Sequence, residues 1–570
     1  MAILSRETAM SRIGSFEFFR HPTRVPPLQG GREAQRHRVV IAGGGPVGLG
    51  LALALSRWGI ASVVIEADHT VCEGSRAICI SRRSLEILDQ LGVLAPFLAK
   101  GLPWEGGRSF YRGDQILHFR MPHDQRQKLP PMINIQQYWI EQFLVEAAQR
   151  LPELIDIRWG TEVTGIEHND AGVALRARAG DTPYSLQADW LVACDGGQSF
   201  VRRHLGLKLE GTAFEGKYII ADIELASDYP TERRAWFDPA SNPGYTVLMH
   251  KQPDDIWRID YQIPDDADLD EAMQPARVTG FIRGHLAMIG EAHRPWKLVW
   301  TSAYRAGAMT LADYRHGRVL FAGNSAHALP IFGVRGLNSG WDDAFNLSWK
   351  LAFVLQGWAG ERLLDTYTEE RIHGYRVNAA SAIKSTEFMA PPSRGFWLMR
   401  EAALSLALAR PEIASVANPR QTSTISYEGS SLNLPGDDFI GGTMPGSVPD
   451  DCPVESARGP CHLSDLPGPH LTAVLFASDG TPAPPLDEAL RALEGGEPPW
   501  CSVIVARLGE PWRQGRREQV IDPEGLAFSR CGALEGSLYL LRPDGHVAGR
   551  WHRPTAATLQ AAVASLCARP

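Results

Sequence analysis

Three glycines near the N-terminus have the spacing of a phosphate-binding turn. Gly43, Gly45 and Gly48 follow one apolar run, VVIA, and precede another, LGLALAL, so the expected order is strand, turn and helix. In such a turn the first glycine permits a tight bend, the second lets a pyrophosphate approach the backbone, and the third allows helix–strand packing. The free N–H groups of the helix start face the phosphates. The sequence predicts a dinucleotide site that includes Gly43, Gly45, Pro46, Val47 and Gly48.

An acidic residue stands where the ribose of such a ligand would lie. Glu66 ends the next expected strand, 62–66, and a carboxylate there accepts hydrogen bonds from ribose hydroxyls. An acid at this point disfavours a 2′-phosphate, so FAD or NAD is expected rather than NADP. The alternative is a glycine-rich turn that holds no ligand.

Two later segments place polar turns after buried strands. Residues 195–202 read DGGQSFVR, and residues 323–327 read GNSAH. With the glycine turn, they make the chain resemble the class A FAD-dependent aromatic monooxygenases, the family of p-hydroxybenzoate hydroxylase and phenol hydroxylase. That family carries a D-G-x-x-S-x-V-R segment and a G-D segment that leads to P-P-x-G-G-x-G-x-N. The resemblance covers roughly residues 36–390.

The resemblance implies non-covalent FAD and further residues that bind it. Arg76 would contact the diphosphate or adenosine side, and Gln137 the ribityl chain or a phosphate. The N–H groups of a helix that starts at Gly336 would face the flavin pyrimidine, where Arg335 adds a positive charge. The set implied is Arg76, Gln137, Asp195, Asn324, Arg335, Gly336, Leu337 and Asn338. His327, in the same loop as Asn324, is expected to be a packing residue.

Three positions depart from the family pattern. Asn324 replaces the usual Asp, so its hydrogen bond to a ribityl hydroxyl would lack the strength that a charge gives. Ile331 replaces the second Pro of P-P, beside the reactive edge of the flavin. Ile78 stands where the phenol hydroxylase branch has an acid, so a proton acceptor for a phenol must come from elsewhere.

The expected antiparallel region supplies the candidate catalytic residues. Arg258 and Asp260 share one face of a strand, 258–264, that resembles the strand of p-hydroxybenzoate hydroxylase with an Arg against the flavin. If that face is a pocket wall, Asp260 is the candidate general base or substrate-orienting group. His250, on the neighbouring strand, would line the same pocket. The alternatives are a surface strand with a charged face and a structural histidine.

An α/β fold must position these residues. A βαβ unit that begins at His37 predicts a Rossmann-type FAD domain with a parallel sheet. Aromatic, alternating strands predict an antiparallel-sheet substrate domain interleaved with it. The C-terminal region resembles the thioredoxin-like domain of the phenol hydroxylase branch. It has no C-x-x-C, so a structural or dimer-supporting role is expected.

The expected divisions follow these changes of pattern. They are an N-terminal arm at 1–36, the first part of the FAD domain at 37–205 with part of the substrate domain near 100–135, the substrate sheet at 206–305, the return of the FAD domain with two long helices at 306–390, a helical segment and linker at 391–460, and the thioredoxin-like domain at 461–570.

Composition argues against other classes of protein. The 57 Lys and Arg and 65 Asp and Glu of the 570 residues give a net charge of −8, which is no footprint for nucleic acid. The 8 Cys form no C-x-x-C, so neither a metal site nor a dithiol centre is expected, and scattered thiols indicate the cytoplasm. The uncharged run at 39–56 approaches membrane-span length, but its glycines and proline favour strand, turn and helix. Residues 1–19 lack the apolar core of a secretory signal.

The resemblance therefore implies a single-component enzyme that hydroxylates a phenolic or related aromatic substrate. It would use NADPH or NADH and O2 and act through a flavin C4a-hydroperoxide. The partners implied are a small aromatic substrate and a second copy of the chain, a homodimer, with no nucleic acid and no membrane. The alternative is a non-hydroxylating flavoprotein oxidoreductase or flavin-binding protein of the same fold. The W-x-W-x-I-P motif of flavin halogenases is absent.

Overall fold

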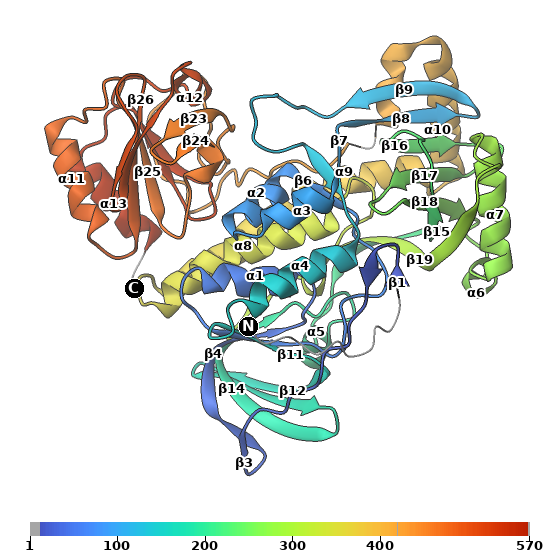
Figure 1. Cartoon of the computed structure of the whole chain (residues 1–570), viewed down its shortest axis with the longest axis horizontal. Coiled ribbons are helices and arrows are strands. Elements are labelled where there is room, and N and C mark those ends of the chain that lie inside the picture. Colours follow the sequence, from blue (N-terminus) through green and yellow to red (C-terminus); the bar gives the residue numbers. More distant parts are fainter. Residues whose placement is uncertain (1–11, 419, 568–570) are drawn as a thin grey trace.

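Two large interleaved sheets and a C-terminal α/β unit form most of the computed structural model, which describes residues 12–418 and 420–567 (Figure 1). Residues 1–11 of the expected N-terminal arm lie outside the described part. The remainder of that arm contributes short strands, and the first long strand already begins at Arg32.

The first sheet has nine strands with a parallel centre. Its core is the apolar segments that the sequence predicted: β4 pairs in parallel with β5 and β14, and β14 pairs in parallel with β21. The bounds are β11 Ile155–Arg158, β5 Ser62–Ile65, β4 Arg32–Ala42, β14 Thr182–Ala193, β13 Gly172–Ala179, β12 Thr161–Asn169, β21 Val319–Phe321, β20 Arg315–His316 and β3 Leu28–Gln29. This is the predicted Rossmann-type arrangement.

The uncharged run at 39–56 forms the end of β4, a turn and helix α1, Pro46–Ser56. α1 is buried from Gly48 to Leu55 because it packs against α4, Gln137–Gln149, and α8, Gly336–Leu355. Within the described ranges, no helix combines the length and the apolar composition that a membrane crossing requires.

The second sheet has eight strands, of which only β16 and β8 pair in parallel. In order they are β22 His327–Ala328, β19 Trp296–Thr310, β15 Glu210–Leu225, β18 Ile256–Ile263, β17 Thr246–Lys251, β16 Arg233–Phe237, β8 Gly106–Tyr111 and β9 Asp114–Arg120. The last two strands come from the 100–135 region.

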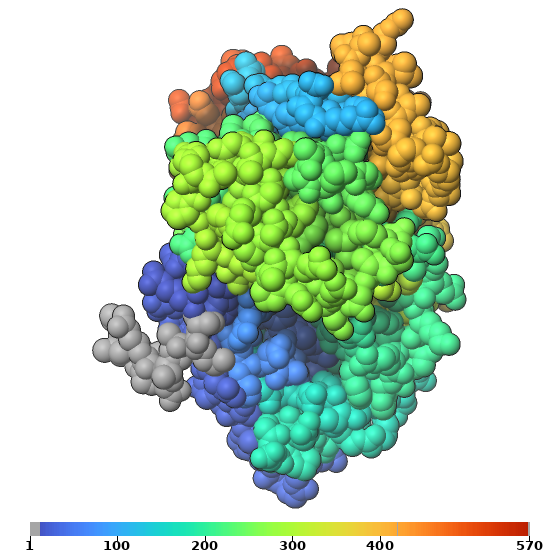
Figure 2. Space-filling view, turned by 90° about the vertical axis from the view of Figure 1, so that its right-hand side faces the viewer, coloured from blue at the N-terminus to red at the C-terminus, as the bar shows by residue number. Residues whose placement is uncertain are grey.

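Helix α7, Pro275–Met288, which the sequence did not predict, covers the outer face of this sheet (Figure 1). The yellow-green atoms of this region form the surface turned to the viewer in Figure 2. Its apolar residues share a core with Trp257, Ile259 and Tyr261 of β18. Because side chains alternate along a strand, the residues between these face the opposite way, towards the first sheet.

The C-terminal unit has its own sheet, as expected. β25, Leu471–Phe476, lies at its centre, parallel to β26, Trp500–Ala506, and antiparallel to β29, Leu538–Leu541. The sheet also includes β23, Pro453–Ser456, so the unit begins before residue 461. The thioredoxin-like assignment of this unit stays a prediction.

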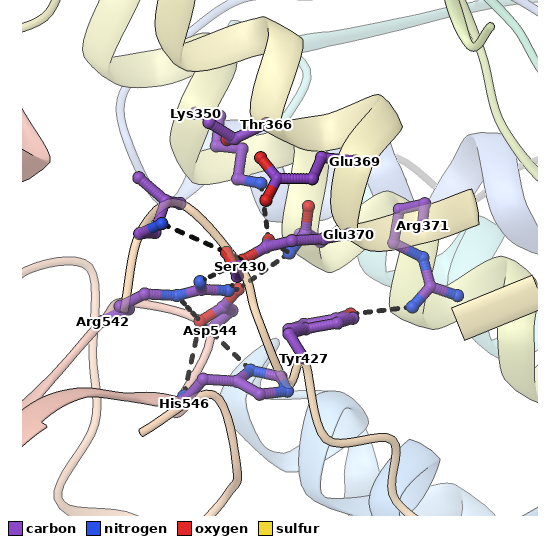
Figure 3. Close-up of polar contacts among 12 residues, drawn as sticks. Lys350, Thr366, Glu369, Glu370, Arg371, Tyr427, Ser430, Arg542, Asp544 and His546 are labelled. Atoms are coloured by element: carbon purple, nitrogen blue, oxygen red, sulfur yellow. Dashed lines mark hydrogen bonds and ion pairs between the residues drawn. The ribbon is translucent and has the colours of Figure 1, made fainter. Parts of the chain in front are cut away.

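Buried charges join this unit to the body of the molecule (Figure 3). Glu370, on α9, Asp365–Met389, pairs with Lys350 of α8 at 2.6 Å and with Arg542 of the C-terminal unit. Arg542 also pairs with Asp544 at 2.6 Å, and Asp544 accepts a hydrogen bond from the indole N–H of Trp349. Because buried charges are costly unless paired, these contacts fix how the unit docks.

The change Glu370→Gln tests this docking. It leaves the buried Lys350 without a carboxylate and removes one of the two carboxylates that pair with Arg542. Breaking a buried ion pair from one side costs about 3–5 kcal/mol. Urea denaturation should therefore show a fall of that size in the free energy of unfolding. Glu369→Gln is the matched control, because Glu369 is exposed and only bonds Ser431, so it should cost about 1 kcal/mol or less. Equal losses in both variants would contradict the account.

Candidate active site

The glycine turn, the DGGQSFVR segment and the GNSAH segment follow strands whose carboxyl ends are aligned in the first sheet. Ala42 of β4 lies opposite Ile65 of β5 and Ala193 of β14, and Ala193 lies opposite Phe321 of β21. The turns after these strands therefore open at the same edge of the sheet. The carboxyl edge of a parallel sheet is where such folds bind ligands.

A cavity of about 1070 Å³ lies between this edge and the second sheet. Every expected cofactor or catalytic residue lines it except Gly48 and Asn338. The lining residues from the predicted set are Gly43, Gly45, Pro46, Val47, Glu66, Arg76, Gln137, Asp195, Asn324, Arg335, Gly336, Leu337, His250, Arg258 and Asp260. The fold thus brings the two predicted groups to one place.

The three glycines of the first turn have different constraints. Gly43 has φ +105°, and a Cβ there would lie 2.5 Å from the carbonyl oxygen of Cys194. A Cβ on Gly48 would lie 2.0 Å from the carbonyl oxygen of Gly43, so only glycine allows the helix to pack this closely against the turn. A Cβ on Gly45 would meet nothing within 4 Å and would project beside the cavity. Gly45 therefore leaves the room that a phosphate at the start of α1 needs.

Two carboxylates at the cavity suit a ligand with hydroxyl groups. Glu66 accepts the backbone N–H of Gly44 at 2.6 Å and that of Asp68 at 2.9 Å, and burial raises its pKa. Asp195 accepts the N–H of Val201 through Oδ2 at 3.0 Å, while its buried Oδ1 has no hydrogen-bond partner. An acceptor left open at the wall fits a dinucleotide, whose ribose and ribityl hydroxyls are donors.

Asn324 is exposed to the cavity from a short 3-10 turn, η1, Gly323–Ser325. The turn is held from behind by Asp343, which accepts the N–H of Gly323 and a hydrogen bond with His327, both at 2.8 Å. Arg371 donates to the same carboxylate at 2.6 Å, and these partners lower the pKa of Asp343 to about 2 against the effect of burial. His327 is thus a buried structural residue, as expected.

The first turn of α8 faces the cavity through Gly336 and Leu337. Arg335, just before it, is buried and donates to the carbonyl oxygens of Phe332 and Arg420, at 2.9 and 2.8 Å, and burial lowers its pKa to about 10. A helix start and a guanidinium together make a site for negative charge. Asn338 differs from the expectation: its side chain points away and accepts from the N–H of Ser81 at 2.9 Å, which fastens α8 to the body of the domain.

Gln137 and Arg76 lie on one side of the cavity. The amide oxygen of Gln137 accepts the backbone N–H groups of Arg76 and Ala77, at 3.3 and 3.2 Å. Gln137 therefore shapes the loop, and the exposed Arg76 lines the cavity wall beside it.

The wall from the second sheet is buried along the whole of β18, so a solvent-exposed charged face is not what the structure shows. Arg258 forms two 2.8 Å bonds with Asp222 and donates to the backbone oxygens of Ser75 and Arg76. Its guanidinium therefore anchors the loop that carries Arg76. The charge of Arg258 is balanced before any ligand enters.

Asp260 and His250 each present an unpaired hydrogen-bonding atom at this wall. Asp260 Oδ1 and His250 Nδ1 are buried without a hydrogen-bond partner. Burial raises the pKa of Asp260 to about 7, against the opposing effect of Arg258, and burial lowers the pKa of His250. A carboxyl group with a pKa near 7 at a cavity wall is suited to take and return a proton.

Sequence reasoning missed Arg233 of β16, which lines the same wall and is 3% exposed. It stands in the run ERRAW beside Arg234, and the only signal was alternation, which put one of the two on the cavity face.

A protein-family model described as FAD binding domain matches residues 36–378. The chain belongs to this family. The 6-methylpretetramide 4-monooxygenase of Streptomyces rimosus is 29% identical over 546 residues, which cover 94% of each chain. A 3-(3-hydroxy-phenyl)propionate/3-hydroxycinnamic acid hydroxylase of Klebsiella pneumoniae is 30% identical over 65% of this chain and 66% of its own.

Solved structures agree in fold. The flavin-dependent monooxygenase PieE, in complex with FAD and substrate, matches 94% of this chain and all of its own with a TM-score of 0.78 at 24% identity. Aklavinone-11 hydroxylase, with FAD and aklavinone, has a TM-score of 0.75 at 23% identity over the same shares of the two chains. The chain is accordingly an enzyme of the class A flavin monooxygenases, and its cofactor is FAD.

The change Gly45→Ala separates binding from folding. Since its Cβ meets no protein atom, the cofactor-free variant should melt at the parent temperature, but the methyl group would occupy the phosphate's place. We expect the Kd of FAD, from fluorescence titration, to rise about tenfold or more, which is ~1.4 kcal/mol. Gly113→Ala is the control, since it also has open space and lies in the β8–β9 turn away from the cavity. Unchanged FAD affinity in Gly45→Ala would place the phosphates elsewhere.

Proposed function

We propose that this enzyme hydroxylates a phenolic ring with FAD, NADPH or NADH, and O2. The observation that carries the proposal is Asp260, a buried carboxyl group with an open oxygen in the same cavity as the FAD-site residues. In the overall reaction NAD(P)H gives a hydride and a proton is consumed. One oxygen atom of O2 replaces a ring hydrogen as hydroxyl, and the other leaves as water.

The proposed cofactor contacts run along the cavity. The start of α1, with Gly45, would hold the diphosphate, and Glu66 the adenosine ribose. Asp195 and Asn324 would take hydroxyls of the ribityl chain, and Arg335 with the start of α8 would face the pyrimidine edge of the ring. When bound there, FAD supplies the hydride acceptance and the oxygen activation that no amino-acid side chain offers.

The protein's own part is to bind, orient and deprotonate the phenol. Asp260 would accept the phenolic proton, because its pKa of about 7 makes it a base near neutral pH that still releases the proton afterwards. His250 would remain uncharged and accept or donate one hydrogen bond to the ring substituents. Apolar wall residues would exclude water from the reacting edge; they include Leu248, Leu329 and Phe332.

A panel of phenols tests the proposal. We expect at least one phenolic acid or multi-ring phenol to stimulate NAD(P)H oxidation and to yield a product heavier by one oxygen atom in the mass spectrum. Oxidation that is never stimulated, or that never yields a hydroxylated product, would favour the alternative, a flavoprotein that does not hydroxylate. We also propose a homodimer in the cytoplasm; the cysteines are scattered along the chain and form no C-x-x-C, which supports a reducing compartment.

Asp260→Asn tests the proposed base. The variant should reduce its flavin at a rate near that of the parent but hydroxylate about 10²–10⁴-fold more slowly in stopped-flow measurements of the two half-reactions. Since only the ionised carboxyl is a base, the parent rate of hydroxylation should rise as pH passes about 7, and the variant should lack this rise. Asp228→Asn, at an exposed site, is the control. A parent-like rate and pH profile in Asp260→Asn would rule out this role.

A further inference from the structure

We propose that Arg233 is the anion-binding residue of the substrate wall, and that the aromatic substrate carries an ionised oxygen that pairs with it. The proposal rests on the proposed function, because it concerns the substrate of that reaction. It names a specificity-determining contact and the charge of the substrate class: a phenolate or an aromatic carboxylate.

The first support is the burial of Arg233 without a counter-ion. Arg233 lines the cavity but is only 3% exposed. Its guanidinium donates one 2.9 Å hydrogen bond, to the uncharged side chain of Gln421. Its Nε is buried and has no hydrogen-bond partner. Among the residues the structure describes, no carboxylate forms an ion pair with Arg233 within 4.0 Å.

The neighbouring Arg234, on the same strand, provides a comparison because its charge is paired. Its side chain points to the other face of β16, where it pairs with Glu232, donates to the hydroxyl of Tyr229 at 2.6 Å and lies over that ring. The two adjacent arginines thus differ in their ion pairs: Arg234 pairs with a carboxylate, whereas Arg233, at the cavity, forms no ion pair with a carboxylate of the described residues. A buried charge of this kind is costly unless it gains a partner.

The rest of the substrate end does not supply that partner. Arg258 and Asp222 neutralise one another, and Arg335 bonds only to carbonyl oxygens. Burial raises the pKa of Asp260 and so favours its neutral form, although the charge of Arg233 opposes this. Burial and then the charge of Arg233 lower the pKa values of Arg335 and His250, so further positive charge is disfavoured there. The end of the cavity that meets substrate therefore has an excess of positive charge before a ligand enters.

An ionised oxygen on the substrate removes this excess. If the oxygen is a phenolate, Arg233 stabilises the charge that appears when Asp260 takes the proton, and the ring becomes electron-rich at the positions to be hydroxylated. If it is a carboxylate, Arg233 fixes the orientation of the ring through a fork of two N–H groups. Both sources present the same chemistry to the guanidinium.

Three probes with the same ring system distinguish a phenolate from a carboxylate. They are a naphthol, the naphthoate with its carboxylate at the same ring position, and the methyl ester of that naphthoate. Each is titrated into the FAD-loaded enzyme without NAD(P)H, and binding is followed by the visible absorbance of the flavin. The parent should bind at least one ionisable probe about 10- to 100-fold more tightly than the neutral ester, the range for hydrogen bonds to a charged group.

Variants assign the preference to one residue. Arg233→Met should abolish it, Arg233→Lys should retain part of it, and Arg234→Met should keep it in full. FAD content and melting temperature are measured for each variant, and Arg233→Lys provides the test if Arg233→Met does not fold. Preference for the naphthol assigns a phenolate and preference for the naphthoate a carboxylate, and either supports the proposal.

The proposal is overturned if the parent shows no preference, if none of the probes perturbs the flavin, or if the preference survives in Arg233→Met. These outcomes are independent of turnover. An enzyme that hydroxylates phenols but shows no Arg233-dependent preference contradicts this inference alone. A charge preference in a chain that never hydroxylates contradicts the proposed function instead.

Discussion

The buried carboxylate of Asp343 is the contact on which the arrangement of the active site depends. It is fully enclosed and receives the N–H of Gly323, His327 and Arg371. Three separate elements therefore meet at one charge: the turn η1 that presents Asn324, the helix α8 whose first residues line the cavity, and the helix α9. Because a buried charge tolerates no loss of partners, this junction holds the turn and the helix start in fixed positions.

The same junction extends to the C-terminal unit. Arg371 also donates to the hydroxyl of Tyr427 at 2.7 Å, and the ring of Tyr427 stacks on His546, which pairs with Asp544 (Figure 3). A chain of direct contacts thus runs from the C-terminal unit to the turn beside the cavity. This gives the unit, which has no C-x-x-C, a physical connection to the cofactor site through α8 and α9.

Local sequence patterns predicted those elements whose structure depends on neighbouring residues. The run of strand, glycine turn and helix at 39–56 and the long helix from Gly336 were confirmed, because apolar periodicity and glycine geometry act over a few residues. Two features depend on which distant strands lie side by side: the pairing of Arg258 with Asp222, and the absence of an ion-pair partner for Arg233 among the described residues. A local sequence pattern does not predict such long-range pairing. The helix α7 was not predicted: its buried apolar residues Val278, Ile282 and Leu286 recur at a helical spacing inside a region that was assigned to alternating strands.

The central claim is that one cavity holds FAD along the edge of the first sheet, with its ring against the wall of the second. A crystal structure of the enzyme with FAD tests it most directly. The account predicts the diphosphate at the start of α1 beside Gly45, and the flavin ring between the start of α8 and the strand that carries Asp260. Density for the flavin outside this cavity, or a ring separated from Asp260 by protein side chains, would contradict it.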